Sequence, residues 1–67
     1  MSPAELRRVI QRLREQKELT QRDLAARAKV TPGYIAQLEM GLRKNPSLPV
    51  LRRLAHALGV SVTELLK

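Results

Sequence analysis

The sequence predicts an all-α fold, a compact bundle of five short helices in one domain. Three observations predict it. Hydrophobic residues recur at the spacing i, i+3, i+4 and i+7, which is typical of amphipathic helices. Residues that cap helices precede each such stretch, and no stretch shows the alternation of a half-buried strand. The chain has 67 residues and no cysteine, so an aliphatic core built mainly from leucines must stabilise it.

The boundaries of the helices follow from capping residues and glycines. The helices are predicted over residues 3–17, 21–28, 32–40, 48–58 and 62–66. Each begins after a hydroxyl side chain that can cap its first turn: Ser2, Thr20, Thr31, Ser47 and Ser61. Gly41 and Gly59 stop the third and fourth helices.

Hydrophobic spacing assigns an inner face to each helix. The first helix turns inward with Leu6, Val9, Ile10 and Leu13. The second and third helices and the turn between them contribute Leu24, Ala25, Ala28, Val30, Ile35 and Leu38. The fourth helix contributes Leu48, Leu51, Leu54, Ala55 and Leu58. Its outer face carries Arg52, Arg53 and His56, which makes His56 a surface histidine.

Residues 20–39, TQRDLAARAKVTPGYIAQLE, carry two helices that meet at Ala28-Lys29-Val30, a corner too short to be a linker. This is the pattern of a helix-turn-helix unit. With "LTQRDLA", "YIAQLE-G" and "NPSLPVLRRLAHALGV", the chain from about Leu6 to Leu66 resembles the lambda repressor and Cro-type (XRE-like) DNA-binding domains of bacterial and phage regulators. The resemblance implies a five-helix, lambda-repressor-like fold.

Lys29 departs from that resemblance, because relatives usually have glycine at this turn. The residue there tends to adopt a positive φ, which costs lysine roughly 1 kcal/mol relative to glycine. We predict that Lys29 is left-handed or that the turn relaxes by one residue. A charge near a phosphate is the functional interpretation, and tolerated drift is the alternative.

The charge balance predicts a polyanionic partner. Lys and Arg number 13 against six acids, a net charge of +7 with a sequence pI of about 11.2. Between Thr20 and Arg53, seven basic residues and two acids give +5 of that total. The single aromatic residue, Tyr34, argues against a stacking platform for single-stranded nucleic acid and disfavours RNA as the ligand.

The inventory of reactive side chains argues against an enzyme. There is no cysteine, the lone His56 has no acidic neighbour, and no metal-ligand cluster or phosphate-cradling loop is present in the sequence. We therefore expect no catalytic residue, metal or cofactor, and no small-molecule ligand is evident. No apolar run has the length of a membrane span and no signal peptide is recognisable, so we expect a cytoplasmic, bacterial or phage-type protein associated with the nucleoid.

A helix-turn-helix domain inserts the second helix of the unit into the major groove. In this chain that helix comprises residues 31–40. With Ile35 and Leu38 inward, Gly33, Gln37 and Met40 point outward. Gln37 is the first candidate for base readout, because a glutamine amide can bond adenine bidentately. The predicted base-reading residues are Gln37, Gly33, Tyr34, Thr31 and Met40.

A second set of residues is predicted to contact DNA phosphates: Gln21, Arg22, Pro32, Arg43, Lys44, Asn45 and Ser47. The resemblance implies that Gln21 bonds a phosphate and can brace the recognition helix. It also implies an ion pair between Arg14 and Glu39, which we interpret as structural because an unpaired inward carboxylate would be costly.

Two alternatives to a sequence-specific transcriptional regulator stay open. The same fold occurs in antitoxins and co-regulators whose main partner is a protein. The short chain also allows an engineered minimal DNA binder or a truncated regulator. An apolar end of the chain predicts a homodimer through Val60, Val62, Leu65 and Leu66.

Overall fold

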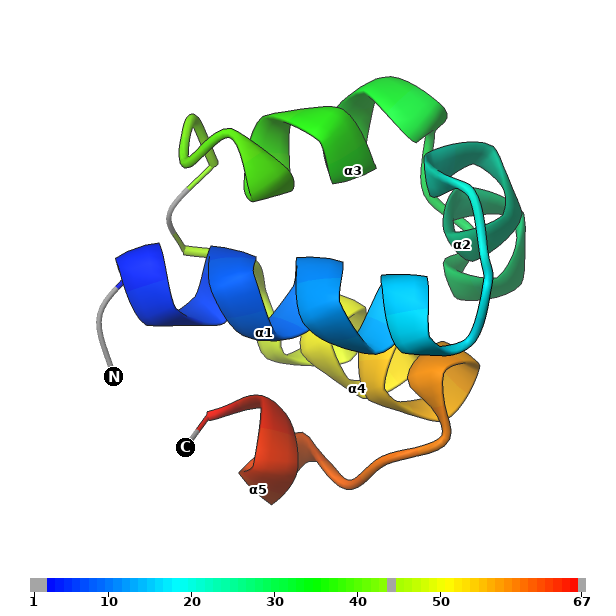
Figure 1. The fold of residues 1–67 in the computed structure, drawn as a ribbon. Coiled ribbons are helices and arrows are strands. Elements are labelled where there is room, and N and C mark those ends of the chain that lie inside the picture. The colour runs from blue at the N-terminus through cyan, green and yellow to red at the C-terminus, as the bar shows by residue number, and fades with distance from the viewer. Residues whose placement is uncertain (1–2, 44, 67) are drawn as a thin grey trace.

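The computed structural model describes residues 3–43 and 45–66, with residues 3 and 4 described by backbone alone. These residues form helices and no strand (Figure 1). The helices are α1 (Pro3–Gln16), α2 (Gln21–Ala28), α3 (Pro32–Glu39), α4 (Leu48–Leu58) and α5 (Val62–Leu65). Each begins at the predicted residue, and α1, α3 and α5 end one residue earlier than predicted. The predicted cap Ser2 lies outside the described residues.

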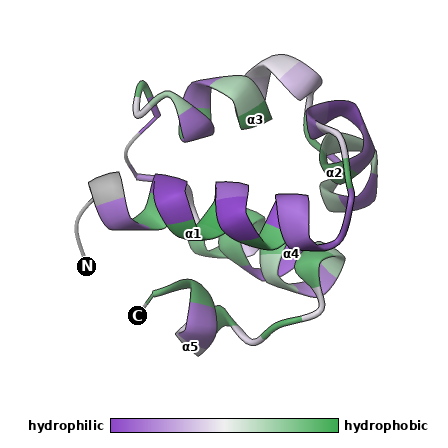
Figure 2. Ribbon diagram, in the orientation of Figure 1, coloured by the Kyte–Doolittle hydropathy of each residue, from purple (hydrophilic) through white to green (hydrophobic). Residues whose placement is uncertain are grey.

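The helices enclose one hydrophobic core. α2 packs against α3 and α4, α1 packs against α3 and α5, and α4 packs against α5. In Figure 1, α3 lies across one side of the bundle, with α2 at its end and α1 in front of α4. Figure 2 shows that the side of α1 nearest the viewer is largely hydrophilic. The most deeply buried large side chains are Leu6, Ile10, Leu24, Ile35, Leu38, Leu54, Leu58 and Leu65.

Two leucines differ from the predicted core. Leu48, predicted to face inward, is 50% exposed because it occupies the first turn of α4, where the loop from α3 arrives. Leu19 lies between α1 and α2, outside any predicted helical face, and is buried. The core therefore extends under the α1–α2 connection and stops short of the start of α4.

Hydroxyl side chains cap the starts of the described helices α2 to α5. Thr20 Oγ1 accepts a hydrogen bond from the Asp23 N–H at 3.0 Å, and the Thr20 N–H donates to Asp23 Oδ2 at 3.0 Å, which completes a capping box. The hydrogen bond from the Thr20 N–H is the main cause that lowers the pKa of the Asp23 carboxyl, and hydrogen bonding with the Thr20 side chain is the second. Thr31, Ser47 and Ser61 cap α3, α4 and α5 with the hydroxyl bond alone.

The ends of α1 to α4 share one motif. In each, a left-handed residue follows the helix and bonds to the carbonyl three residues back, while the next N–H bonds to the carbonyl five back. The left-handed residues are Glu18 (φ 56°), Lys29 (φ 59°), Gly41 (φ 78°) and Gly59 (φ 71°). The prediction that Lys29 is left-handed is confirmed. The left-handed Glu18 was not predicted.

An arginine donates to a backbone carbonyl beside each of the two charged turns. Arg14 Nη1 donates to the Leu19 carbonyl at 2.8 Å, next to Glu18. Arg53 Nε donates to the Ala28 carbonyl at 2.9 Å, next to Lys29. Arg53 is half-buried, although it shares the outer side of α4 with Arg52 and His56. Within residues 3–43 and 45–66, no side chain makes such a bond at the two glycine turns.

Candidate nucleic-acid interface

The inner side of α3 is held by charged and polar groups. Arg14 of α1 donates to both carboxylate oxygens of Glu39, from Nε to Oε2 at 2.7 Å and from Nη2 to Oε1 at 3.0 Å. Gln21 of α2 adds a bond from Nε2 to Glu39 Oε1 at 3.0 Å. The hydrogen bond to Glu39 raises the pKa of Arg14, while partial burial acts in the opposite direction.

This contact joins three helices at one carboxylate. Glu39 is 7% exposed, and its charge is compensated by a bidentate arginine, the strongest geometry available for the pair. Gln21 uses one amide hydrogen for this bond, so its second amide N–H and its side-chain carbonyl oxygen remain for other partners. The arrangement fixes the orientation of α3 relative to α1 and α2.

The outer side of α3 is open. Gly33, Gln37 and Met40 are exposed, and Tyr34 is half-buried. A Cβ added at Gly33 would meet nothing within 4 Å, so the backbone there can be approached closely. Thr31 Oγ1 accepts a bond from the Tyr34 N–H at 3.1 Å, which accounts for Thr31 as the cap of α3.

Gln37, Arg43 and Tyr34 form a cluster that the sequence did not indicate. Arg43 Nε donates to Gln37 Oε1 at 2.9 Å. The Arg43 guanidinium carbon lies 5.1 Å from the centroid of the Tyr34 ring, within the range of a cation–π contact. Arg43 was placed among phosphate contacts by its position in the loop. It lies against the first candidate for base readout.

The residues predicted to contact phosphate border α3 from two sides. Arg22 is exposed in the first turn of α2, and Pro32 is exposed at the start of α3. Asn45 and Ser47 are exposed in the segment that leads into α4. Lys44 lies outside the described residues.

The predicted dimer surface needs one correction. Leu65 is 0% exposed and belongs to the core, because α5 packs its one inward leucine against α1 and α4. Leu65 therefore cannot contact a second molecule. Val60 and Val62 are half-buried against the core, and Leu66 is 38% exposed. Of the four predicted residues, these three keep apolar surface that is accessible.

Other kinds of site find no support in the described part of the chain. No group of three or more His, Cys, Asp or Glu residues among residues 3–43 and 45–66 could hold a metal ion. None of the helices there is long and apolar enough to cross a membrane.

Residues 10–65 match the family model described as "Helix-turn-helix". The chain belongs to the helix-turn-helix family. This helix-turn-helix protein is also 48% identical over 54 residues to the uncharacterised HTH-type transcriptional regulator y4dJ of Sinorhizobium fredii, a match that covers 81% of the chain and 69% of that relative.

Solved structures of regulators share the fold. The restriction-modification controller protein C.AhdI from Aeromonas hydrophila matches with a TM-score of 0.89 and 32% identity, covering 94% of each chain. The master regulator for biofilm formation SinR, solved in complex with DNA, matches with a TM-score of 0.88 and 32% identity, covering 92% of this chain and 98% of that one. These findings confirm the prediction of a lambda-repressor-like, helix-turn-helix DNA-binding domain of the type found in transcriptional regulators.

Proposed function

We propose that this protein reads a specific sequence of double-stranded DNA with α3 in the major groove and thereby regulates transcription. One observation carries the proposal above the others. The inner side of α3 is fixed to α1 and α2 at Glu39, while its outer side presents Gln37 and an open backbone at Gly33. A rigid helix with a free outer side is what groove readout requires.

Gln37 and Arg43 act as one reading unit in this proposal. The bond from Arg43 Nε holds Gln37 Oε1, which leaves the amide N–H groups of Gln37 free to donate to a base. The Nη groups of Arg43 are not used in that bond and can donate to the O6 and N7 acceptors of guanine. The pair therefore favours a guanine beside the base that Gln37 contacts. Met40, 68% exposed, supplies an apolar contact for a thymine methyl.

Phosphate contacts set the register of α3 in the groove. Arg22 and the segment with Asn45 and Ser47 lie on opposite sides of α3 along the chain and are exposed. Arginine and hydroxyl or amide groups are common partners of phosphate oxygens. Gln21 contributes its second amide hydrogen while its first remains on Glu39.

A homodimer on two half-sites is the finer form of the proposal. Val60, Val62 and Leu66 provide its apolar surface. Two such domains on half-sites about one helical turn apart would read a palindrome.

Selection from a randomised duplex library at near-physiological salt tests the proposal. We expect an enriched sequence that contains guanine, and a palindrome with half-sites about 10 bp apart if the protein dimerises. The Gln37→Ala variant should lose discrimination by about 1–3 kcal/mol at one position. Gln11→Ala, at an exposed glutamine of α1, is the matched control and should leave the selected sequence unchanged.

Retention of DNA without enrichment would overturn sequence-specific readout, because counterion release alone gives that result. A protein partner, as in antitoxins and co-regulators, would then become the better explanation of the fold. An enriched single half-site with no palindrome would overturn only the dimer.

A further inference from the structure

A second basic region lies away from α3. The end of α2, the turn after it and the outer side of α4 border an open hollow of about 330 Å³. All of its lining residues are basic: Arg27, Lys29, Arg52, Arg53 and His56. None of them is among the residues proposed above to contact bases or phosphates. The hollow is therefore a separate feature from the proposed DNA interface.

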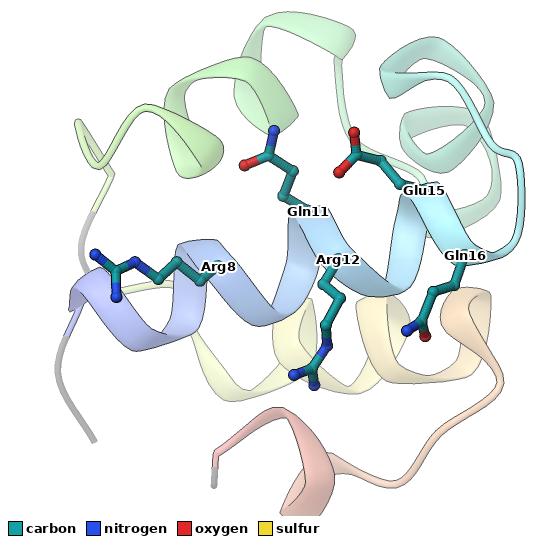
Figure 3. Close-up of a pocket in the computed structure, with 5 residues that line it drawn as sticks. All are labelled: Arg8, Gln11, Arg12, Glu15 and Gln16. Atoms are coloured by element: carbon teal, nitrogen blue, oxygen red, sulfur yellow. The ribbon is translucent and has the colours of Figure 1, made fainter.

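A hollow of similar size on α1 shows that basic residues need not gather in this way. It measures about 440 Å³ and is lined by Arg8, Gln11, Arg12, Glu15 and Gln16. Figure 3 shows its two arginines separated along α1, with the carboxylate of Glu15 among the lining side chains. At the α2–α4 hollow, no acidic residue of the described chain is in the lining.

The α2–α4 hollow is partly preorganised. Arg53 is held in place by the bond from its Nε to the Ala28 carbonyl at 2.9 Å. This bond uses one of the five N–H donors of the guanidinium and leaves the Nη groups for another acceptor. An arginine already fixed in position loses less conformational freedom when it binds a ligand.

Lys29 lines the same hollow and has a backbone conformation that is unfavourable for lysine. Its φ is 59°, at a turn where glycine would be less strained. Neither the core nor the proposed DNA interface uses its side chain, which is exposed. The hollow gives the residue a role, because the left-handed turn places Lys29 in the lining of the same concavity as three arginines and His56.

We propose that this hollow binds a small, free polyanion that carries at least two linked phosphate groups. Four permanent cations without a lining carboxylate attract a multiply charged anion more strongly than a single phosphate. Arginine forks match phosphate oxygens bidentately, and lysine adds a compact charge. The volume lies at the lower end of the range for small-ligand sites, which suits a compact ligand better than a nucleic acid duplex.

Isothermal titration calorimetry with sodium tripolyphosphate at constant ionic strength tests the proposal. The double variant Lys29→Gly/Arg52→Gln should bind tripolyphosphate at least tenfold more weakly than the unmodified protein. The control Arg8→Gln/Arg12→Gln loses the same two charges from the α1 hollow and should change the affinity less than twofold. Arg53 is left intact because it also holds the end of α2.

A second readout separates binding from misfolding. Lys29→Gly alone should raise the melting temperature of the free protein, because it relieves the positive φ, and should still weaken tripolyphosphate binding. A loss of binding with no loss of stability cannot come from unfolding.

Two results would overturn the proposal. Equal weakening in both double variants would mean that tripolyphosphate responds only to net charge. A parallel loss of duplex DNA affinity in Lys29→Gly/Arg52→Gln, together with competition between tripolyphosphate and DNA in the unmodified protein, would assign the hollow to backbone phosphates of DNA. Sequence selection by α3 is measured independently, so failure here leaves the proposed function standing.

Discussion

The ends of α1 and α2 differ from the ends of α3 and α4 in sequence while sharing one backbone motif. Glu18 and Lys29 adopt the left-handed conformation after the first pair, and Gly41 and Gly59 adopt it after the second. Glycine accepts this conformation without a Cβ penalty, whereas a charged residue does not. The motif itself is therefore not determined by glycine.

Arginine contacts distinguish the two pairs. Arg14 and Arg53 donate to carbonyls at the charged ends, and no side chain of the described residues does so at the glycine ends. A hydrogen bond from an arginine side chain can fix a helix end whose own residue disfavours the turn. The helix ends at glycine need no such support, since local conformational preference already favours the turn.

Removal of Arg14 should destabilise the protein more than any other change at these helix ends. Arg14→Ala deletes the contact at the α1 end and strands the buried Glu39, so we expect a loss of about 3–5 kcal/mol in the free energy of unfolding. Chemical denaturation measures it. Glu39→Ala should cost less, though still a few kcal/mol, because Arg14 keeps its bond to Leu19. Arg12→Ala, exposed on the same helix, should change stability by less than about 0.5 kcal/mol. A loss below about 1 kcal/mol in Arg14→Ala would show that solvent compensates the carboxylate.

Removal of Arg53 should affect the α2 end alone. Arg53→Ala deletes the bond to the Ala28 carbonyl, and we expect a loss of about 1.5 kcal/mol because the side chain is only half-buried. Arg52→Ala, its exposed neighbour, provides the control. Equal melting temperatures for the two variants would mean that the α2 end is held by its backbone bonds alone.

Exchange of the turn residues should change the free energy of unfolding in opposite directions at the charged and the glycine ends. Lys29→Gly should raise the free energy of unfolding by roughly 0.5–1 kcal/mol, because relief of the positive φ is partly offset by a more flexible unfolded chain. Gly59→Ala should lower the free energy of unfolding by about 1 kcal/mol, since alanine is strained in the left-handed conformation and its Cβ would lie 3.0 Å from Lys17 Nζ. An unchanged or lowered melting temperature in Lys29→Gly would rule out strain at the corner.

Acid should weaken the start of α2 without touching its end. The capping hydrogen bonds lower the pKa of Asp23 in the folded protein, so its contribution to stability is present above its ordinary pKa. That contribution disappears as the pH falls through the lower folded-state pKa. The difference in melting temperature between the unmodified protein and Asp23→Asn should shrink over this interval. A difference that does not change with pH would show that the carboxylate charge plays no part in the cap.

The helices themselves were predictable because their signals are local. Caps such as Thr20 and Ser47 and stops such as Gly59 lie within a few residues of the turns they determine. The end of α1 was less clear, since Glu18 carries no local signal for a left-handed turn. Leu48 was placed in the core by periodicity alone, which does not report where the core stops.

The site was predictable in outline and not in its contacts. The outer side of α3 follows from helical geometry, so Gln37 could be singled out. The bond from Arg43 to Gln37 depends on how the segment after α3 folds back, and the bond from Arg53 to Ala28 joins residues 25 apart in sequence. Such contacts require the tertiary arrangement, which no sequence period encodes.

Tyr34 gives this protein an intrinsic optical probe in a useful place. The chain contains one tyrosine, no tryptophan and no phenylalanine, so its near-ultraviolet absorption and fluorescence come from this one ring. The ring lies on α3 with the Arg43 guanidinium 5.1 Å from its centre. A ligand that draws Arg43 away should alter the emission, whereas a ligand in the α2–α4 hollow should leave it nearly constant. An unlabelled sample can thus report which of its two basic regions is occupied.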